Sequence, residues 1–156
     1  MEILLLLLCP FMAQALTPCT FLDLKVATSS SAAQMSLTLA SNGSLLFAWE
    51  GLSNAIYVQF FSQTLISLGS SILVNNPVSH TNVEPQVVAF STGTFAVIWE
   101  HSPPPAIYCQ LFYGNGSLNG SSFKINYSGH PTQPTAMIMP NGNFLVTLLV
   151  GGAING

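Results

Sequence analysis

Short apolar runs alternate with polar turns along most of the chain, and each run is about four to eight residues long. In one such run Leu45, Phe47 and Trp49 fall on one face of an extended strand. Leu46 and Ala48 fall on the other face. Because both faces are apolar, the strand is expected to be buried on both sides. Helical periodicity is absent. The pattern therefore predicts an all-β fold with sheets packed face to face.

The same order of blocks returns with a period of about 50 residues. Residues 42–50 (NGSLLFAWE) recur as 92–100 (TGTFAVIWE) and, more loosely, as 141–149 (NGNFLVTLL). Residues 55–61 (AIYVQFF) recur as 106–112 (AIYCQLF). The Asn-Gly pairs supply the positive φ that a tight hairpin needs between two strands. Each period is thus expected to hold short antiparallel strands joined by hairpins.

A further set of blocks, at 24–26, 72–75 and 123–126, brings the number of strands in each period to four. Four antiparallel strands per repeat are typical of a β-propeller blade. We therefore expect four-stranded antiparallel blades in tandem, forming a partial, open β-propeller-like array of about 2.7 repeats after a signal peptide. The repeats are expected at about 24–71, 72–122 and 123–156, the last of them incomplete.

The best copy has a run of residues in a pattern that can be written P…G-x-F-x-x-x-W…I-Y-x-Q-x-F…G…F-x-x-N: Pro85, Gly93, Phe95, Trp99, Ile107, Tyr108, Gln110, Phe112, Gly116, Phe123 and Asn126. This pattern resembles tandem β-propeller-like repeats of secreted and surface proteins in protists and bacteria. The resemblance covers nearly all of the chain from Leu24 onward. It implies a repeat domain outside the cell and brings no catalytic motif with it. The chain departs from the pattern at Leu148, where a Trp is expected, and near Gln34, where the Pro is missing.

Large aromatic residues recur at equivalent repeat positions and are expected to pack between the sheets. The alternative for the Trp and Tyr residues is a platform on which a sugar ring stacks. The expected repeat core is Trp49, Trp99, Tyr57, Tyr108, Phe47, Phe95 and Phe144.

The N-terminal segment has an apolar run at 3–8 and a small-x-small sequence that ends at Ala15. It predicts a signal peptide at 1–15, with 16–156 as the β-repeat domain, because the apolar run is too short to span a bilayer comfortably. Two alternatives stay open: an uncleaved anchor, since Glu2 stands where a basic residue is usual, and bacterial lipidation at Cys19. We expect a secreted, extracellular or cell-surface protein that meets the membrane only transiently, through its signal peptide.

Charged residues make up only 4% of the chain, whereas hydrophobic residues make up 49%. Two bases, Lys25 and Lys124, cannot neutralise a phosphate backbone, so no nucleic-acid partner is expected. The surface must therefore be polar without charge. N-linked glycans on accessible turns would hydrate such a surface. The candidate glycosylation sites are Asn42, Asn115, Asn119 and Asn126.

Cys19 and Cys109 are the cysteines that remain after removal of the signal peptide, and in an oxidising compartment they are candidates for one disulfide. The alternative is a buried free thiol at Cys109. Glu50 and Glu100 both follow a Trp and could serve as a catalytic or cation-binding pair, but the third copy has Leu149 there. We therefore expect these acids to mark the point at which a strand meets solvent.

His80, His101 and His130 stand in polar segments without the spacing of metal ligands. Nucleophile motifs and phosphate-binding loops are absent from the sequence. No catalytic residue, metal site or cofactor is therefore predicted.

The sequence favours a secreted, N-glycosylated structural or cell-surface repeat protein without catalytic activity. Its partners would be further repeats that complete the array, or a second copy that pairs with an open sheet edge. The alternative function is an extracellular carbohydrate- or protein-binding module for adhesion or recognition, whose partner is a glycan or a surface protein.

Overall fold

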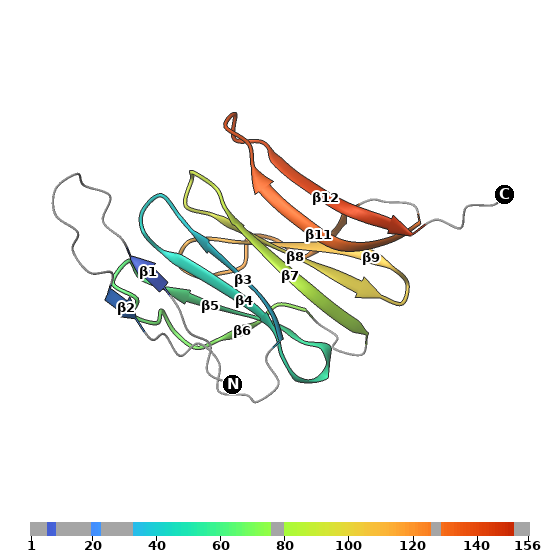
Figure 1. Ribbon diagram of the computed structural model, residues 1–156, viewed down its shortest axis with the longest axis horizontal. Coiled ribbons are helices and arrows are strands. Elements are labelled where there is room, and N and C mark those ends of the chain that lie inside the picture. Colours follow the sequence, from blue (N-terminus) through green and yellow to red (C-terminus); the bar gives the residue numbers. More distant parts are fainter. Residues whose placement is uncertain (1–5, 9–19, 23–32, 76–79, 126–128, 152–156) are drawn as a thin grey trace.

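The computed structural model describes residues 6–8, 20–22, 33–75, 80–125 and 129–151. These residues form an all-β structure built from antiparallel sheets, as the hydrophobic pattern predicted (Figure 1). The one helical element among them is a short 3-10 turn, η1 (Leu52–Asn54). Within these ranges no helix is both long and apolar enough to cross a membrane. Most of the predicted signal peptide lies outside the described residues.

The strands form two four-stranded sheets, a hairpin and one small ribbon. In each sheet every strand pairs with the next one along the chain. The first sheet holds β3 (Ala33–Leu39), β4 (Leu45–Glu50), β5 (Ile56–Phe61) and β6 (Ile72–Leu73). The second sheet holds β7 (Thr81–Ala89), β8 (Phe95–Ser102), β9 (Ala106–Phe112) and β10 (Phe123–Ile125). The hairpin is β11 (His130–Ile138) with β12 (Phe144–Gly151), and the ribbon is β1 (Leu6–Leu8) with β2 (Thr20–Leu22).

The hairpin turns adopt the geometry that the glycines predicted. Gly43, Gly93 and Gly142 have φ values of 83°, 80° and 82°. In each turn the chain closes across three residues, for example by a 2.8 Å hydrogen bond from the Ala40 amide to the Ser44 carbonyl. This is a three-residue hairpin loop, in which a glycine with positive φ comes just before the second strand.

The first strand of each unit contains a bulge that the sequence did not predict. Register shifts interrupt β3, β7 and β11 at equivalent points. Gln34, Glu84 and Gln133 lie at these points with φ values of 40°, 54° and 50°. Residues other than glycine rarely adopt positive φ, so the surrounding sheet contacts must hold these three residues in place.

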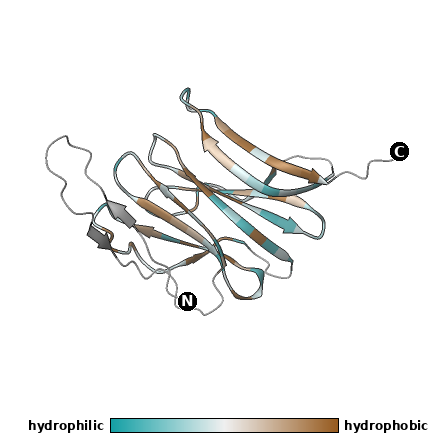
Figure 2. Cartoon of the chain, in the orientation of Figure 1, coloured by the Kyte–Doolittle hydropathy of each residue, from teal (hydrophilic) through white to brown (hydrophobic). Residues whose placement is uncertain are grey.

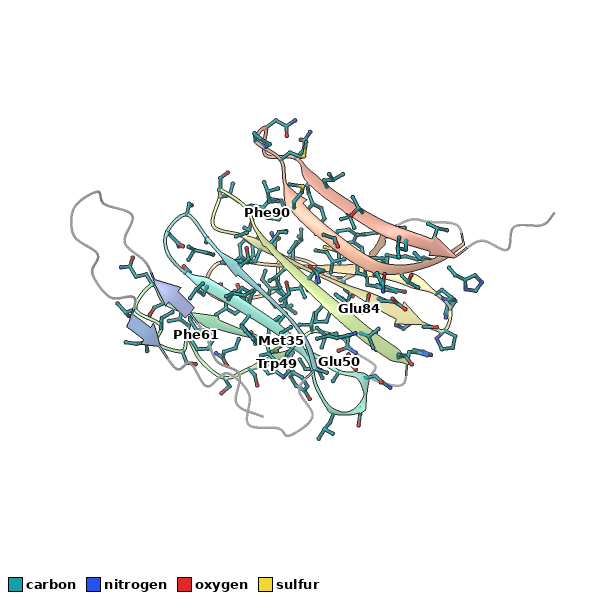
Figure 3. The ribbon with its side chains drawn as sticks, in the orientation of Figure 1. Met35, Trp49, Glu50, Phe61, Glu84 and Phe90 are labelled. Carbon is teal, nitrogen blue, oxygen red and sulfur yellow. The ribbon has the colours of Figure 1, made fainter. Side chains whose placement is uncertain are left out.

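The sheets and the hairpin stack as layers, and the same faces meet each time. Leu46, Ala48, Ile56 and Val58 of the first sheet pack on Phe95, Val97 and Trp99 of the second sheet. The equivalent residues of the second sheet, Ala96, Ile98, Ile107 and Cys109, pack on Phe144 and Leu148 of the hairpin. Figure 3 shows Phe90 beside the hairpin, where its ring lies 5.9 Å from that of Phe144. The core therefore lies between the layers rather than within one barrel.

The sheet boundaries differ from the predicted repeat boundaries. Ile72 and Phe123 were expected to open the second and third repeats, but they begin the last strands of the preceding sheets. A periodic pattern fixes the length of a repeat and not the residue at which it starts, so this difference could not be resolved from the sequence. The expected strand at 24–26 lies outside the described residues.

Candidate functional site

A pocket of about 310 Å³ opens where the first two sheets meet. Asn75 reaches it from the end of the first sheet, and His80 and Asn82 reach it from the start of the second. Trp99, His101 and Tyr108 come from the paired strands β8 and β9, and Pro104 and Ser122 complete the lining. No lining residue is a carboxylate, so the wall is aromatic, amide, imidazole and hydroxyl in character.

Four rings form a continuous row along the pocket. Trp99 stacks on Tyr108, with ring centroids 5.8 Å apart and planes at 20°, because the two residues are directly opposed in the β8–β9 register. His101 meets the edge of Tyr108 at 5.1 Å, since it lies two residues beyond Trp99 on the same face. His80 in turn meets His101 at 4.9 Å. The row brings together two histidines that are 21 positions apart in the chain.

Asn82 holds this arrangement and is 1% exposed. Its Oδ1 accepts a hydrogen bond from Trp99 Nε1 at 3.1 Å and lies 2.9 Å from His101 Nδ1. Its Nδ2 donates to the carbonyls of Asn54 and His80 at 3.1 and 2.8 Å. Because an indole N–H can only donate, the amide oxygen must face Trp99, and His101 Nδ1 must then carry a proton. In neutral His101 the other ring nitrogen, Nε2, is therefore the one with a free lone pair.

The pocket keeps His101 neutral at pH 7. Its pKa lies below the ordinary value of 6.5, first because burial removes water from the ring, and then because His80 and Lys124 repel a positive charge there. The first sheet repeats the aromatic stack between Trp49 and Tyr57, at 5.7 Å and 20°, but not the histidine. Gly51 stands at the position of His101, and a Cβ there would lie 2.7 Å from the Tyr57 ring. The first sheet thus has the aromatic stack without an imidazole beside it.

Glu50 and Glu100 lie at equivalent positions in successive layers. Glu100 Oε2 accepts a hydrogen bond of 3.2 Å from the amide of Gln133, which sits in the β11 bulge. Burial, and then the charge of Glu84, raise the pKa of Glu50. Figure 3 shows Glu50 at the end of β4 and Glu84 on β7. The described residues contain no group of three or more metal-ligating side chains that could hold an ion.

The predicted glycosylation sites fall mostly on turns. Asn42 and Asn115 are exposed, and each side-chain oxygen accepts a 3.0 Å hydrogen bond from the amide of the serine two residues later. Asn119 is half-buried beside the turn at Gly120. Asn126 lies outside the described residues. Glycosylation of all four stays a prediction.

Cys109 is a buried free thiol in the interface between the second sheet and the hairpin. Burial raises its pKa to about 12. No disulfide is found at Cys109, and Cys19 lies outside the described residues. The buried free thiol, which was the alternative interpretation of the sequence, describes Cys109 in the structure.

The seven residues expected in the repeat core lie at the interfaces between layers or on the outer face of the first sheet. Trp49, Trp99, Phe47 and Phe95 are buried, whereas Tyr57, Tyr108 and Phe144 are half-buried against the clusters. Figure 3 shows Trp49 and Phe61 in the first sheet, toward opposite ends of the paired strands β4 and β5.

Comparison with protein-family models and with curated proteins finds no match.

The hairpin is the one stacked layer with two described strands. β4 and β8 each pair with a strand on both sides, whereas β12 pairs only with β11 among the described strands. The outward face of the hairpin leaves Met137, Leu145 and Leu149 exposed by 53%, 39% and 59%. Figure 2 shows β12 coloured largely as apolar. In the second sheet, Ala96 is the equivalent of Leu145, and the hairpin covers it.

Proposed function

We propose that the chain is a secreted, N-glycosylated, propeller-like β-repeat module that acts as a structural or surface scaffold without catalysis. In this proposal the β11–β12 hairpin is the assembly site, where further repeats or a second copy complete the array. The observation that carries the proposal is the outer edge of β12, with which no described strand pairs, together with the apolar face beside it.

The arrangement of the first strands supports a propeller-like stack. β7 contacts both β3 and β11, so the first strands of the three layers lie side by side (Figure 1). Hydrogen bonds join these strands across the layers: the Glu84 amide donates to Gln34 Oε1 at 2.8 Å, and the Val87 amide donates to Ser36 Oγ at 3.1 Å. In a propeller the innermost strands of successive blades meet in this way around the axis.

The hairpin has both features that favour addition of a strand. An exposed edge offers main-chain donors and acceptors, and the apolar side chains beside it gain from burial. Full burial of a Leu or Met side chain contributes about 1.5–3 kcal/mol. Because Met137, Leu145 and Leu149 are each about half exposed, their cover would contribute roughly 3 kcal/mol together.

Sedimentation velocity of the secreted chain tests the assembly site. We expect the wild type to associate as its concentration rises, and Met137→Glu with Leu145→Glu to weaken this association strongly. Leu52→Glu is the matched control, because Leu52 is 64% exposed on η1, away from the hairpin. A wild type that is monomeric at every concentration, or a control that weakens association equally, would contradict the proposal.

A second candidate function is recognition of a carbohydrate or a surface protein at the pocket of about 310 Å³ that His101 and Tyr108 line, called the end pocket below. The row of Trp99, Tyr108, His101 and His80 favours it, because aromatic walls with a few fixed polar groups are typical of small-molecule sites.

A further inference from the structure

We propose that the end pocket binds an acidic monosaccharide, whose carboxylate pairs with a protonated His101 while its ring lies against Tyr108. This inference rests on the second candidate function, recognition at the same pocket, and names the class of ligand. It does not depend on assembly at the hairpin.

The charges around the pocket favour an anion. His80 faces His101 from the residue before β7, Tyr108 faces it from β9, and Lys124 acts on it from β10. Glu100 is the next residue along β8, but its side chain points to the other face and contacts Gln133. No carboxylate lines the pocket, two imidazoles do, and Lys124 is close enough to repel a positive charge on His101, in a chain whose net charge is −3.

Asn82 prepares His101 to gain a proton at one atom. The Nδ1–H already donates to Asn82 Oδ1, and this bond is the same in the neutral and the protonated ring. A proton taken from solvent must therefore go to Nε2. That step creates an N–H donor and a positive charge, which together make a charge-assisted hydrogen bond to a carboxylate.

Without a ligand, burial first and then the neighbouring His80 and Lys124 lower the pKa of His101 below 6.5. A bound carboxylate would reverse part of this penalty, because an opposite charge within hydrogen-bond distance favours the imidazolium. Binding and proton uptake are then linked, so the affinity must rise as the pH falls.

The size and the wall of the pocket favour a sugar acid over a simple carboxylate. A volume of about 310 Å³ is at the small end of ligand pockets and suits a single sugar ring. Tyr108 and Pro104 offer apolar surface for a ring face, and Ser122 offers a hydroxyl for hydrogen bonding. The Asn75 amide is already hydrogen-bonded to the Ile56 amide and the Asn54 carbonyl. The positive charge of Lys124 disfavours a metal ion beside His101.

Calorimetric titration of the full chain with D-glucuronate, and with D-glucose as the neutral match, tests the proposal. We expect glucuronate to bind more tightly at about pH 5.5 than at about pH 8 and to take up a proton as it binds. Its Kd should rise by as much as about tenfold per pH unit above the pKa of His101. Glucose should bind more weakly and without this dependence.

Variants separate the pocket from the rest of the surface. His101→Gln should remove the pH dependence and most of the affinity. It is preferred to His101→Ala, in case that variant fails to fold, because Gln retains an N–H donor for Asn82 Oδ1. His130→Ala is the matched control, because His130 is exposed on β11 and does not line the pocket. It should bind glucuronate as the wild type does.

Three outcomes would overturn the inference. Equal binding of glucose and glucuronate that is lost in Tyr108→Ala would leave recognition at the pocket intact and refute the selection of an anion. Binding of neither sugar would refute both the inference and sugar recognition. Equal loss in His130→Ala would place the binding elsewhere.

Discussion

Replacement of Asn82 by Ala would measure how much one buried side-chain amide contributes to the free energy of unfolding. The substitution removes four hydrogen-bond contacts, of which the most consequential is the one to Trp99 Nε1, because Trp99 is 3% exposed and water cannot easily replace the amide oxygen. An unsatisfied buried donor costs about 1–3 kcal/mol. His101 and His80 are half-buried and Asn54 is exposed, so water can partly replace Asn82 at these three partners, and those losses together are about 1 kcal/mol.

We therefore expect Asn82→Ala to lower the free energy of unfolding by about 2–4 kcal/mol, a large share of the roughly 5–15 kcal/mol of an ordinary domain. Urea denaturation monitored by Trp fluorescence and by circular dichroism measures the change. Asn143→Ala is the control: Asn143 is exposed in a turn, and its replacement should alter stability by no more than about 0.5 kcal/mol.

A double-mutant cycle with Trp99→Phe isolates the hydrogen bond. Phe lacks the indole N–H, so Asn82→Ala should cost about 1–2 kcal/mol less in the Phe background than in the wild type. If the two substitutions are additive within about 0.5 kcal/mol, the Asn82–Trp99 bond does not stabilise the fold and the reasoning is refuted.

Two further predictions concern ionisable groups. Burial and the charge of Glu100 raise the pKa of Glu84 above 4.5, so the native state holds its proton more tightly than the unfolded state does, and stability should fall as pH rises from 4.5 through the raised pKa. Glu84→Gln, which copies the residue at the equivalent bulges, should flatten this fall in pH-dependent denaturation; an unchanged slope would assign it to other groups. The raised pKa and burial of Cys109 predict that its thiol reacts with a disulfide reagent in urea but very slowly in the native protein, without reductant in either case. No reaction in urea would instead indicate a disulfide to Cys19.

The sequence predicted the strands and turns because their causes are local. Consecutive apolar residues such as Leu45 and Leu46 indicate that both faces of a strand are buried. Gly93 and Gly142 indicate a positive φ in a hairpin. The bulges could not be predicted in the same way. Glu84 and Gln133 are ordinary polar residues whose left-handed backbone is imposed by neighbouring strands.

The sequence did not predict most of the candidate site, because its residues come together only where two sheets meet. His80 and His101 meet only after β7 pairs with β8, and Asn82 becomes buried only when the first sheet covers it. One signal was present: His101 lies two residues beyond Trp99, on the same strand face. Its meaning depended on Asn82, which stood in a polar segment with no mark of burial.

At each interface one face of a layer packs on the opposite face of the next layer. Ala48 belongs to the same cluster as Trp99, and its equivalent Ile98 belongs to the same cluster as Leu148. A gene encoding such a chain can gain or lose one period by tandem duplication or deletion, because every new unit carries both halves of the contact. Selection would then act on the length of the array without requiring a new interface to evolve.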